Sequence, residues 1–211
     1  PDDELEGLVV QLAGLEGGLE QGLALVRRGQ RSVEHQTLAE HDQGKTRAVR
    51  ELSEAHQRTL HFLLDRVPAR EYGWVLSGSA SLRLQGVDVP VHDLDIESSP
   101  ADIYRIEKVL AEFIQTPVHV WESEAIRSLD GKDEVEGVQV EMLADMQVRQ
   151  QDGIWVSLSD FERRMELEWQ GSLIQVFPLE EEAAAYQAMG RTEKAGLIRE
   201  TIHKMKEASH V

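Results

Sequence analysis

The chain has 211 residues, and its 39 acidic and 22 basic side chains give a formal net charge of −17 at pH 7. A negative surplus of this size excludes general attraction to a nucleic-acid backbone or an anionic membrane, so we expect no non-specific nucleic-acid binding. The sequence holds no cysteine, which excludes disulfides, thiol catalysis and zinc–thiolate sites. It shows no long apolar run and no secretory signal, so we expect no membrane partner and a cytoplasmic location.

The first third of the chain is predicted to form a helical arm over residues 1–67. Leucines recur there at alternating steps of three and four residues, which is typical of a helix that packs along one seam: Leu5, Leu8, Leu12, Leu15 and Leu19. A second seam runs from Val49 to Leu63, and polar residues 27–44 between the two seams predict a turn that folds the helices into a hairpin. Pro68 is predicted to end the second helix.

Glycines make the first predicted helix weak on its own. Each glycine inside a helix costs roughly 1 kcal/mol relative to alanine, and the segment contains Gly7, Gly14, Gly17, Gly18 and Gly22. Such a helix needs a packing partner. We therefore predict a homodimer through the N-terminal helices, and the alternative is a hairpin that lies on its own domain.

Residues 68–211 are predicted to form an α+β domain, in which helices pack on a small mixed β-sheet. The apolar patterns predict strands at residues 74–76, 91–97, 118–121, 137–143, 154–157 and 172–177. They predict helices at residues 80–85, 101–114, 161–169, 179–189 and 192–208. The acidic stretch 123–136 is predicted to be a helix followed by a loop, with a turn at Asp130-Gly131.

The stretch GSASLRLQGVDVPVHDLDI, residues 78–96, combines two features that together suggest chemistry. Asp93 and Asp95 are two positions apart on a predicted strand, so their carboxylates point to the same face. Two adjacent carboxylates repel each other unless a cation, a proton or several donors offset their charge, and Mg²⁺ bridging to phosphates would do so. Upstream, Gly78 allows a close backbone approach, and Ser79 offers a hydroxyl at the predicted start of a helix.

This stretch resembles the signature of the polymerase-beta-like nucleotidyltransferase superfamily, in particular its small bacterial members. The matching parts are an apolar residue before Gly78-Ser79, a gap of roughly a dozen residues, and then Asp93-x-Asp95. The resemblance implies that Gly78 and Ser79 bind the triphosphate, and that Asp93 and Asp95 bind catalytic Mg²⁺ or Mn²⁺. It also implies a third carboxylate on a later strand.

Glu141, in the apolar-flanked stretch VQVEML, is the best match for this third catalytic and metal-binding carboxylate, and Asp145 is the alternative. The closing segment, residues 178–202, resembles the last helices of the small bacterial members, which commonly carry a basic residue near the nucleotide. The lysine expected around Gln187 is absent, so Arg191 and Lys194 are the predicted nucleotide-binding residues.

These observations predict a metal-dependent nucleotidyltransferase that moves a nucleoside monophosphate from a nucleoside triphosphate to a hydroxyl acceptor. The acceptor stays open between an antibiotic, an RNA end, a protein side chain and a small metabolite. The alternative is a catalytically silent protein of the same fold that acts as a regulatory or interaction module, which the missing lysine near Gln187 would favour. Binding of a nucleoside triphosphate with magnesium separates the two.

Overall fold

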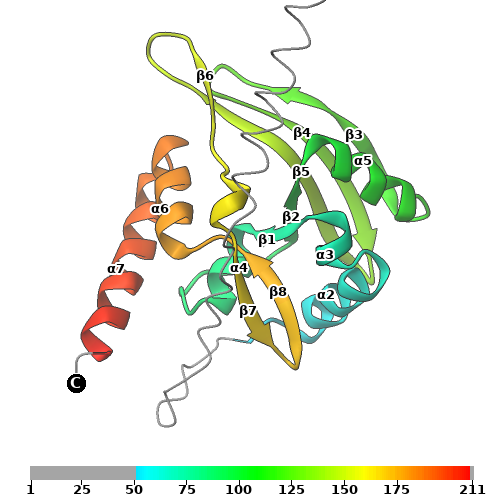
Figure 1. The fold of residues 1–211 in the computed structure, drawn as a ribbon, viewed down its shortest axis with the longest axis horizontal. Helices are drawn as coiled ribbons and strands as arrows, with labels where there is room; N and C mark the ends of the chain where they lie inside the picture. Colours follow the sequence, from blue (N-terminus) through cyan, green and yellow to red (C-terminus); the bar gives the residue numbers. More distant parts are fainter. Residues whose placement is uncertain (1–50, 210–211) are drawn as a thin grey trace, which may run out of the picture. The chain divides into compact units, whose positions relative to one another are not determined.

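A mixed sheet runs through the computed structural model, which describes residues 51–209 (Figure 1). Within these residues the strand order is β3-β4-β5-β2-β1-β8-β7, and β6 pairs with β5. β2 is parallel to β5 and β1 is parallel to β8, whereas the other neighbours are antiparallel. The strands are β1 Val75–Ser77, β2 Leu94–Ser98, β3 Ile114–Glu122, β4 Ile126–Val135, β5 Val138–Arg149, β6 Trp155–Ser157, β7 Met165–Trp169 and β8 Ser172–Val176.

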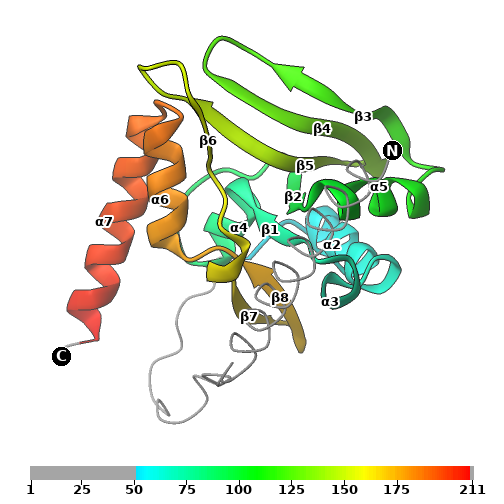
Figure 2. The same cartoon turned by 45° about the horizontal axis from the view of Figure 1, so that its top comes forward.

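Two groups of helices pack around this sheet (Figures 1 and 2). The helices are α2 Glu54–Arg66, α3 Ala69–Tyr72, α4 Gly78–Leu84, α5 Pro100–Val109, α6 Leu179–Ala188 and α7 Thr192–Ala208. The main core joins α2 and α5 to the inner residues of β2 and β5. A second core joins α4, α6 and α7. The predicted α+β class with a mixed sheet and packed helices is therefore confirmed.

Side-chain alternation on the two central parallel strands separates the core from the opposite face of the sheet. Leu94 and Ile96 of β2 are fully buried in the main core, as are Val140 and Met142 of β5. Because strand side chains alternate, the residues between them point to the other face. Asp95 and Glu141 are therefore directed away from the main core.

The start of α5 shows how local sequence fixes an element. The Ser99 hydroxyl accepts a hydrogen bond from the Asp102 backbone N–H, and Pro100 occupies the first turn. A serine cap satisfies one of the free backbone donors of a helix, and proline tolerates this position because it has no N–H to leave unpaired. The helix thus begins within one residue of the predicted start, but it ends at Val109 rather than at residue 114.

Two predictions of secondary structure are wrong. Residues 126–135 form strand β4 and not a helix and loop, because their backbone pairs with β3 on one side and β5 on the other. The helix predicted over residues 161–169 is limited to the 3₁₀ turn Phe161–Arg163, since Met165–Trp169 pairs with β8 as strand β7.

The last part of the predicted arm packs into the core of the sheet: Leu60 and Leu63 of helix α2 and Val67, which directly follows it, are fully buried. The predicted first helix, the hairpin turn and the homodimer through them concern residues that lie outside the described range. None of the helices in residues 51–209 is long and apolar enough to cross a bilayer.

Candidate active site

A cavity of about 480 Å³ lies over the polar face of the sheet. Its floor includes Asp95, Glu97 and Glu141 from the central strands, and α6 contributes Glu182 and Tyr186 to its wall. The β3–β4 hairpin adds further walls, and Arg191 lies at the start of α7. Of the charged residues singled out from the sequence, Asp95, Glu141 and Arg191 line the cavity, whereas Asp93 and Lys194 are not among its lining residues.

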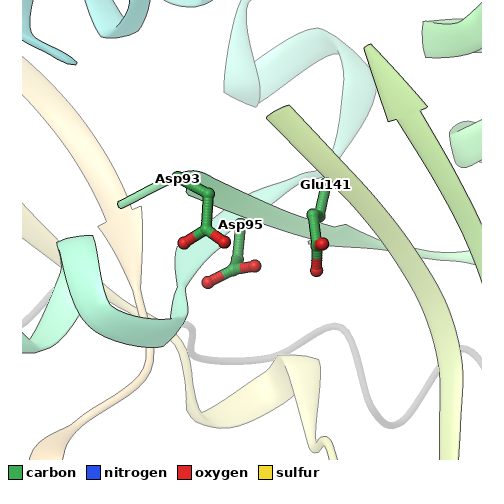
Figure 3. A group of neighbouring side chains, drawn as sticks. All are labelled: Asp93, Asp95 and Glu141. Atoms are coloured by element: carbon green, nitrogen blue, oxygen red, sulfur yellow. The ribbon is translucent and has the colours of Figure 1, made fainter. Parts of the chain in front are cut away.

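Strand register places the predicted carboxylates side by side. Asp95 is paired with Ser77 of β1 on one side and with Glu141 of β5 on the other. One oxygen from each of Asp93, Asp95 and Glu141 lies within 4.8 Å of the others, and Figure 3 shows the three side chains converging. Asp93 directly precedes β2, so the strand begins three residues later than predicted.

Gly78 approaches Asp95 more closely than any other residue type could. Its φ is +62°, a left-handed conformation that suits glycine. A Cβ atom built at Gly78 would lie 1.8 Å from the Asp95 Oδ2 atom. Ser79, the next residue, is buried and is not among the residues that line the cavity, so the structure brings Gly78 to the carboxylates more directly than Ser79.

The carboxylates form an environment suited to a divalent cation. The pKa of Asp95 is raised to about 7, chiefly by burial and then by the charges of Asp93 and Glu141, while Lys194 and Arg191 oppose the rise. The surrounding cations therefore do not balance the negative charge. Oxygen ligands in this number and spacing are what Mg²⁺ and Mn²⁺ prefer.

Glu141 is held in place by donors from the same face of the sheet. Lys132 of β4 is its register neighbour and donates to Glu141 Oε1 at 2.7 Å, and Gln139 Nε2 donates to the same atom at 2.9 Å. Asp145, the alternative third carboxylate, is exposed, has a φ of +49° and accepts a hydrogen bond from Gln147. It does not join the group of three, because the backbone departs from regular strand conformation at that point.

The two predicted basic residues lie near the carboxylates. The Lys194 ammonium is 4.6 Å from the centre of the Tyr186 ring, and the Arg191 guanidinium is 5.9 Å from it. Burial lowers the pKa of Lys194, and the charge of Asp95 counteracts this effect. A cation that is partly desolvated next to an aromatic ring attracts anions more strongly than one in open water.

Two acidic residues of the cavity were missed. Glu97 follows Asp95 by two positions on β2, is 3% exposed and accepts a hydrogen bond from the Ser159 hydroxyl. Glu182 of α6 is 6% exposed, and its Oε1 atom has no hydrogen-bond partner among the described residues. Burial is the main cause that raises the pKa of Glu97 to about 7 and that of Glu182 to about 8.

The period of two that identified Asp93 and Asp95 extends to Glu97 and could have found it. No sequence signal distinguishes Glu182 from its acidic neighbours on α6. Lys132, Asp130 and Trp121 were missed because the β3–β4 hairpin was not expected to form a wall of the site.

A glycine turn packed on paired aspartates, with a third carboxylate on the parallel neighbouring strand, defines the nucleotidyltransferase class. Comparison with known proteins agrees with this assignment. Residues 59–205 match the family described as aminoglycoside-2''-adenylyltransferase, and the chain belongs to this family. The predicted superfamily is thereby confirmed, and the chain is a nucleotidyltransferase.

Among solved structures, a crystal structure of a candidate nucleotidyltransferase from Thermotoga maritima is similar to the chain, with a TM-score of 0.65 and 33% sequence identity. The match covers 75% of this chain and 99% of that one. No curated protein shows significant sequence similarity to the chain.

Proposed function

We propose that the chain transfers a nucleoside monophosphate, AMP from ATP, to a hydroxyl group of an amine-bearing sugar of the aminoglycoside type, and that it depends on a divalent metal. The observation that carries this proposal is the register of Asp95 with Glu141 beside Gly78. It gives three converging carboxylates next to a glycine that lets the Asp95 carboxylate lie against the backbone. The donor and the acceptor class are taken from the family description.

Asp93, Asp95 and Glu141 would hold the metal, Mg²⁺ or Mn²⁺. When bound, the metal neutralises charge on the phosphates and on the departing pyrophosphate. The backbone of Gly78 lies directly beside the Asp95 carboxylate because glycine has no side chain. Gly78 and the hydroxyl group of the next residue, Ser79, would bind the triphosphate.

Arg191 and Lys194 would neutralise the outer phosphates of the nucleotide, since both already act electrostatically on Asp95. Glu141 is the carboxylate of the three that also reaches the β4 side of the cavity, through Lys132. We assign it the task of orienting the acceptor hydroxyl and accepting its proton.

Acidic side chains favour a cationic acceptor. Besides the metal-binding group, Glu97, Asp130, Asp160, Glu181 and Glu182 line the cavity. A polyamine sugar carries several positive charges, and a cavity with this excess of carboxylates attracts it and disfavours anionic acceptors such as RNA.

Transfer can be tested with each of the four nucleoside triphosphates, Mg²⁺ and a panel of hydroxyl acceptors that includes aminoglycosides. We expect pyrophosphate release and a product heavier by one AMP residue. Asp93→Asn should abolish both, whereas Asp65→Asn, which changes an exposed carboxylate on α2, should leave them unchanged. Full activity of Asp93→Asn would contradict the proposal.

A second candidate function is the silent regulatory module. One observation favours it: Gln187, near which related proteins commonly carry a lysine, accepts a hydrogen bond from Arg199 and supplies no positive charge. Calorimetric titration with ATP and GTP in the presence of Mg²⁺ separates the candidates, because a silent module would give no metal-dependent heat.

A further inference from the structure

We propose that Glu97 and Glu182 form a binding subsite for a protonated amine of the acceptor, and that they determine specificity for amine-bearing acceptors. The inference rests on the proposed function, because it places this subsite in the same cavity as the transfer reaction. Neither residue belongs to the group of three carboxylates that could hold a metal.

The two carboxylates come from different elements and border the same cavity. Glu97 lies on the sheet floor one strand repeat beyond Asp95, and Glu182 lies on the helix wall. They are 3% and 6% exposed, so the surrounding protein has removed both from bulk water. Glu97 is close enough for its charge to act on Glu182.

The protein leaves these carboxylates short of donors. The Ser159 hydroxyl donates to Glu97, but the buried Glu182 Oε1 atom has no hydrogen-bond partner among the described residues. Within residues 51–209, neither glutamate forms an ion pair with a lysine, an arginine or a histidine. A buried carboxylate without donors is costly, and a ligand that supplies donors and positive charge removes that cost.

Two other acids of the cavity, Glu181 and Asp160, have partners within the protein. Glu181 binds Arg163 at 2.6 Å, and the Asp160 carboxylate accepts a hydrogen bond from the Glu162 backbone N–H. The Arg163–Glu181 ion pair ties the 3₁₀ turn to α6. It thereby keeps the segment that carries Ser159 against the cavity.

The chemistry of the pair selects an ammonium group. An ammonium has three donors and a compact charge, so it can bridge Glu182 Oε1, a Glu97 oxygen and one further acceptor. A neutral hydroxyl would supply a single donor and no charge. An N-acetylated amine would keep a single weak donor and would add bulk.

The test is calorimetric binding, without nucleotide, of an aminoglycoside and of the same compound with all amines acetylated. We expect the free amine to bind and the acetylated compound to bind at least roughly ten-fold more weakly, as loss of a charge-assisted hydrogen bond implies. Glu182→Gln and Glu97→Gln should each weaken binding of the free amine roughly ten- to hundred-fold. The matched control is Glu180→Gln, which lies on the same helix, pairs with Lys206 and does not line this cavity.

Steady-state kinetics give a second readout. In both variants the KM for the acceptor should rise while the KM for ATP stays unchanged, and a melting curve should show that each variant is folded. Glu182→Asp, which keeps the charge, should restore part of the acceptor affinity.

Equal binding of the free and acetylated compounds, or wild-type amine binding by Glu182→Gln, would overturn the inference. Transfer that proceeds normally in Glu182→Gln would leave the proposed function standing and would refute only the subsite. Amine binding that is lost in Glu182→Gln, without pyrophosphate release from the wild type, would refute the transfer and keep the subsite.

Discussion

Replacing Asp95 by asparagine should stabilise the metal-free protein while it abolishes transfer. The pKa of Asp95 is raised from 3.8 to about 7, first by burial and then by the charges of Asp93 and Glu141. Between these two pH values the folded state keeps a proton that the unfolded chain has released, so the free energy of unfolding falls as the pH rises through this window. Three pKa units correspond to roughly 4 kcal/mol as an upper limit.

Asparagine has the same shape and no charge to desolvate, so it fits beside Gly78 and removes most of this penalty. Above pH 7 we expect a gain of about 2 kcal/mol, because an asparagine amide still lacks the full hydration that it has in the unfolded chain. For a domain of this size that gain raises the Tm by roughly 4–8 °C. Near pH 4 the Tm difference should vanish, since the wild-type carboxyl is then protonated when folded.

Thermal melts of the wild type and of Asp95→Asn, at about pH 8 and about pH 4, measure this effect. Added Mg²⁺ should raise the Tm of the wild type and leave that of the variant nearly unchanged, because the variant has lost a metal ligand. A lower Tm for the variant at pH 8 without metal would refute the reasoning, since it would mean that the Asp95 charge is already stabilised by the protein.

Three other predictions concern the same sheet. Asp133 is fully buried, its two oxygens have no hydrogen-bond partner among the described residues, and its pKa is raised to about 6, mainly by burial. Asp133→Asn should therefore raise the Tm at pH 8, and this gain should fade towards pH 4. A Tm difference between variant and wild type that stays the same at both pH values would contradict this cause. Gly78→Ala should cost roughly 2–4 kcal/mol in urea melts and abolish calorimetric ATP binding, because its φ is +62° and its new Cβ would collide with Asp95. Lys132→Met should tighten Mn²⁺ binding by about ten-fold in a titration, because it removes a cation 2.7 Å from Glu141. Weaker Mn²⁺ binding by the variant would show that Lys132 instead orients the Glu141 carboxylate.

The centre of the site could be predicted because its determinants are local. Asp93 and Asp95 are related by the period of a strand, and Gly78 lies where β1 passes into α4, a junction that the sequence marks with a glycine. Glu141 lies far along the chain, yet its alternation with Val140 and Met142 was enough to place it on the polar face of a strand. The structure then pairs it with Asp95, a parallel register that no local pattern specifies.

The cavity walls could not be predicted, for a different physical reason. Strand β4 exposes Ser128, Asp130 and Lys132 to the cavity and places Asp133 in the core, so polar residues occur on both faces and apolar alternation is lost. Only pairing with β3 and β5 makes this segment a strand. Glu182 could not be predicted for a related reason: the packing of α6 against the domain decides which of the adjacent acidic residues on this helix becomes buried.

With the proposed amine subsite at Glu97, the spacing of side chains on β2 would set a fixed distance along the acceptor. Asp95 and Glu97 are separated by one pleat repeat of roughly 6.6–6.8 Å, fixed by the backbone. A reaction centre at one and an amine anchor at the other would make the enzyme measure how far the modified hydroxyl lies from a charged nitrogen. Regioselectivity would then be encoded in main-chain geometry, and altering it would require shifting the helix opposite rather than exchanging residues on the strand.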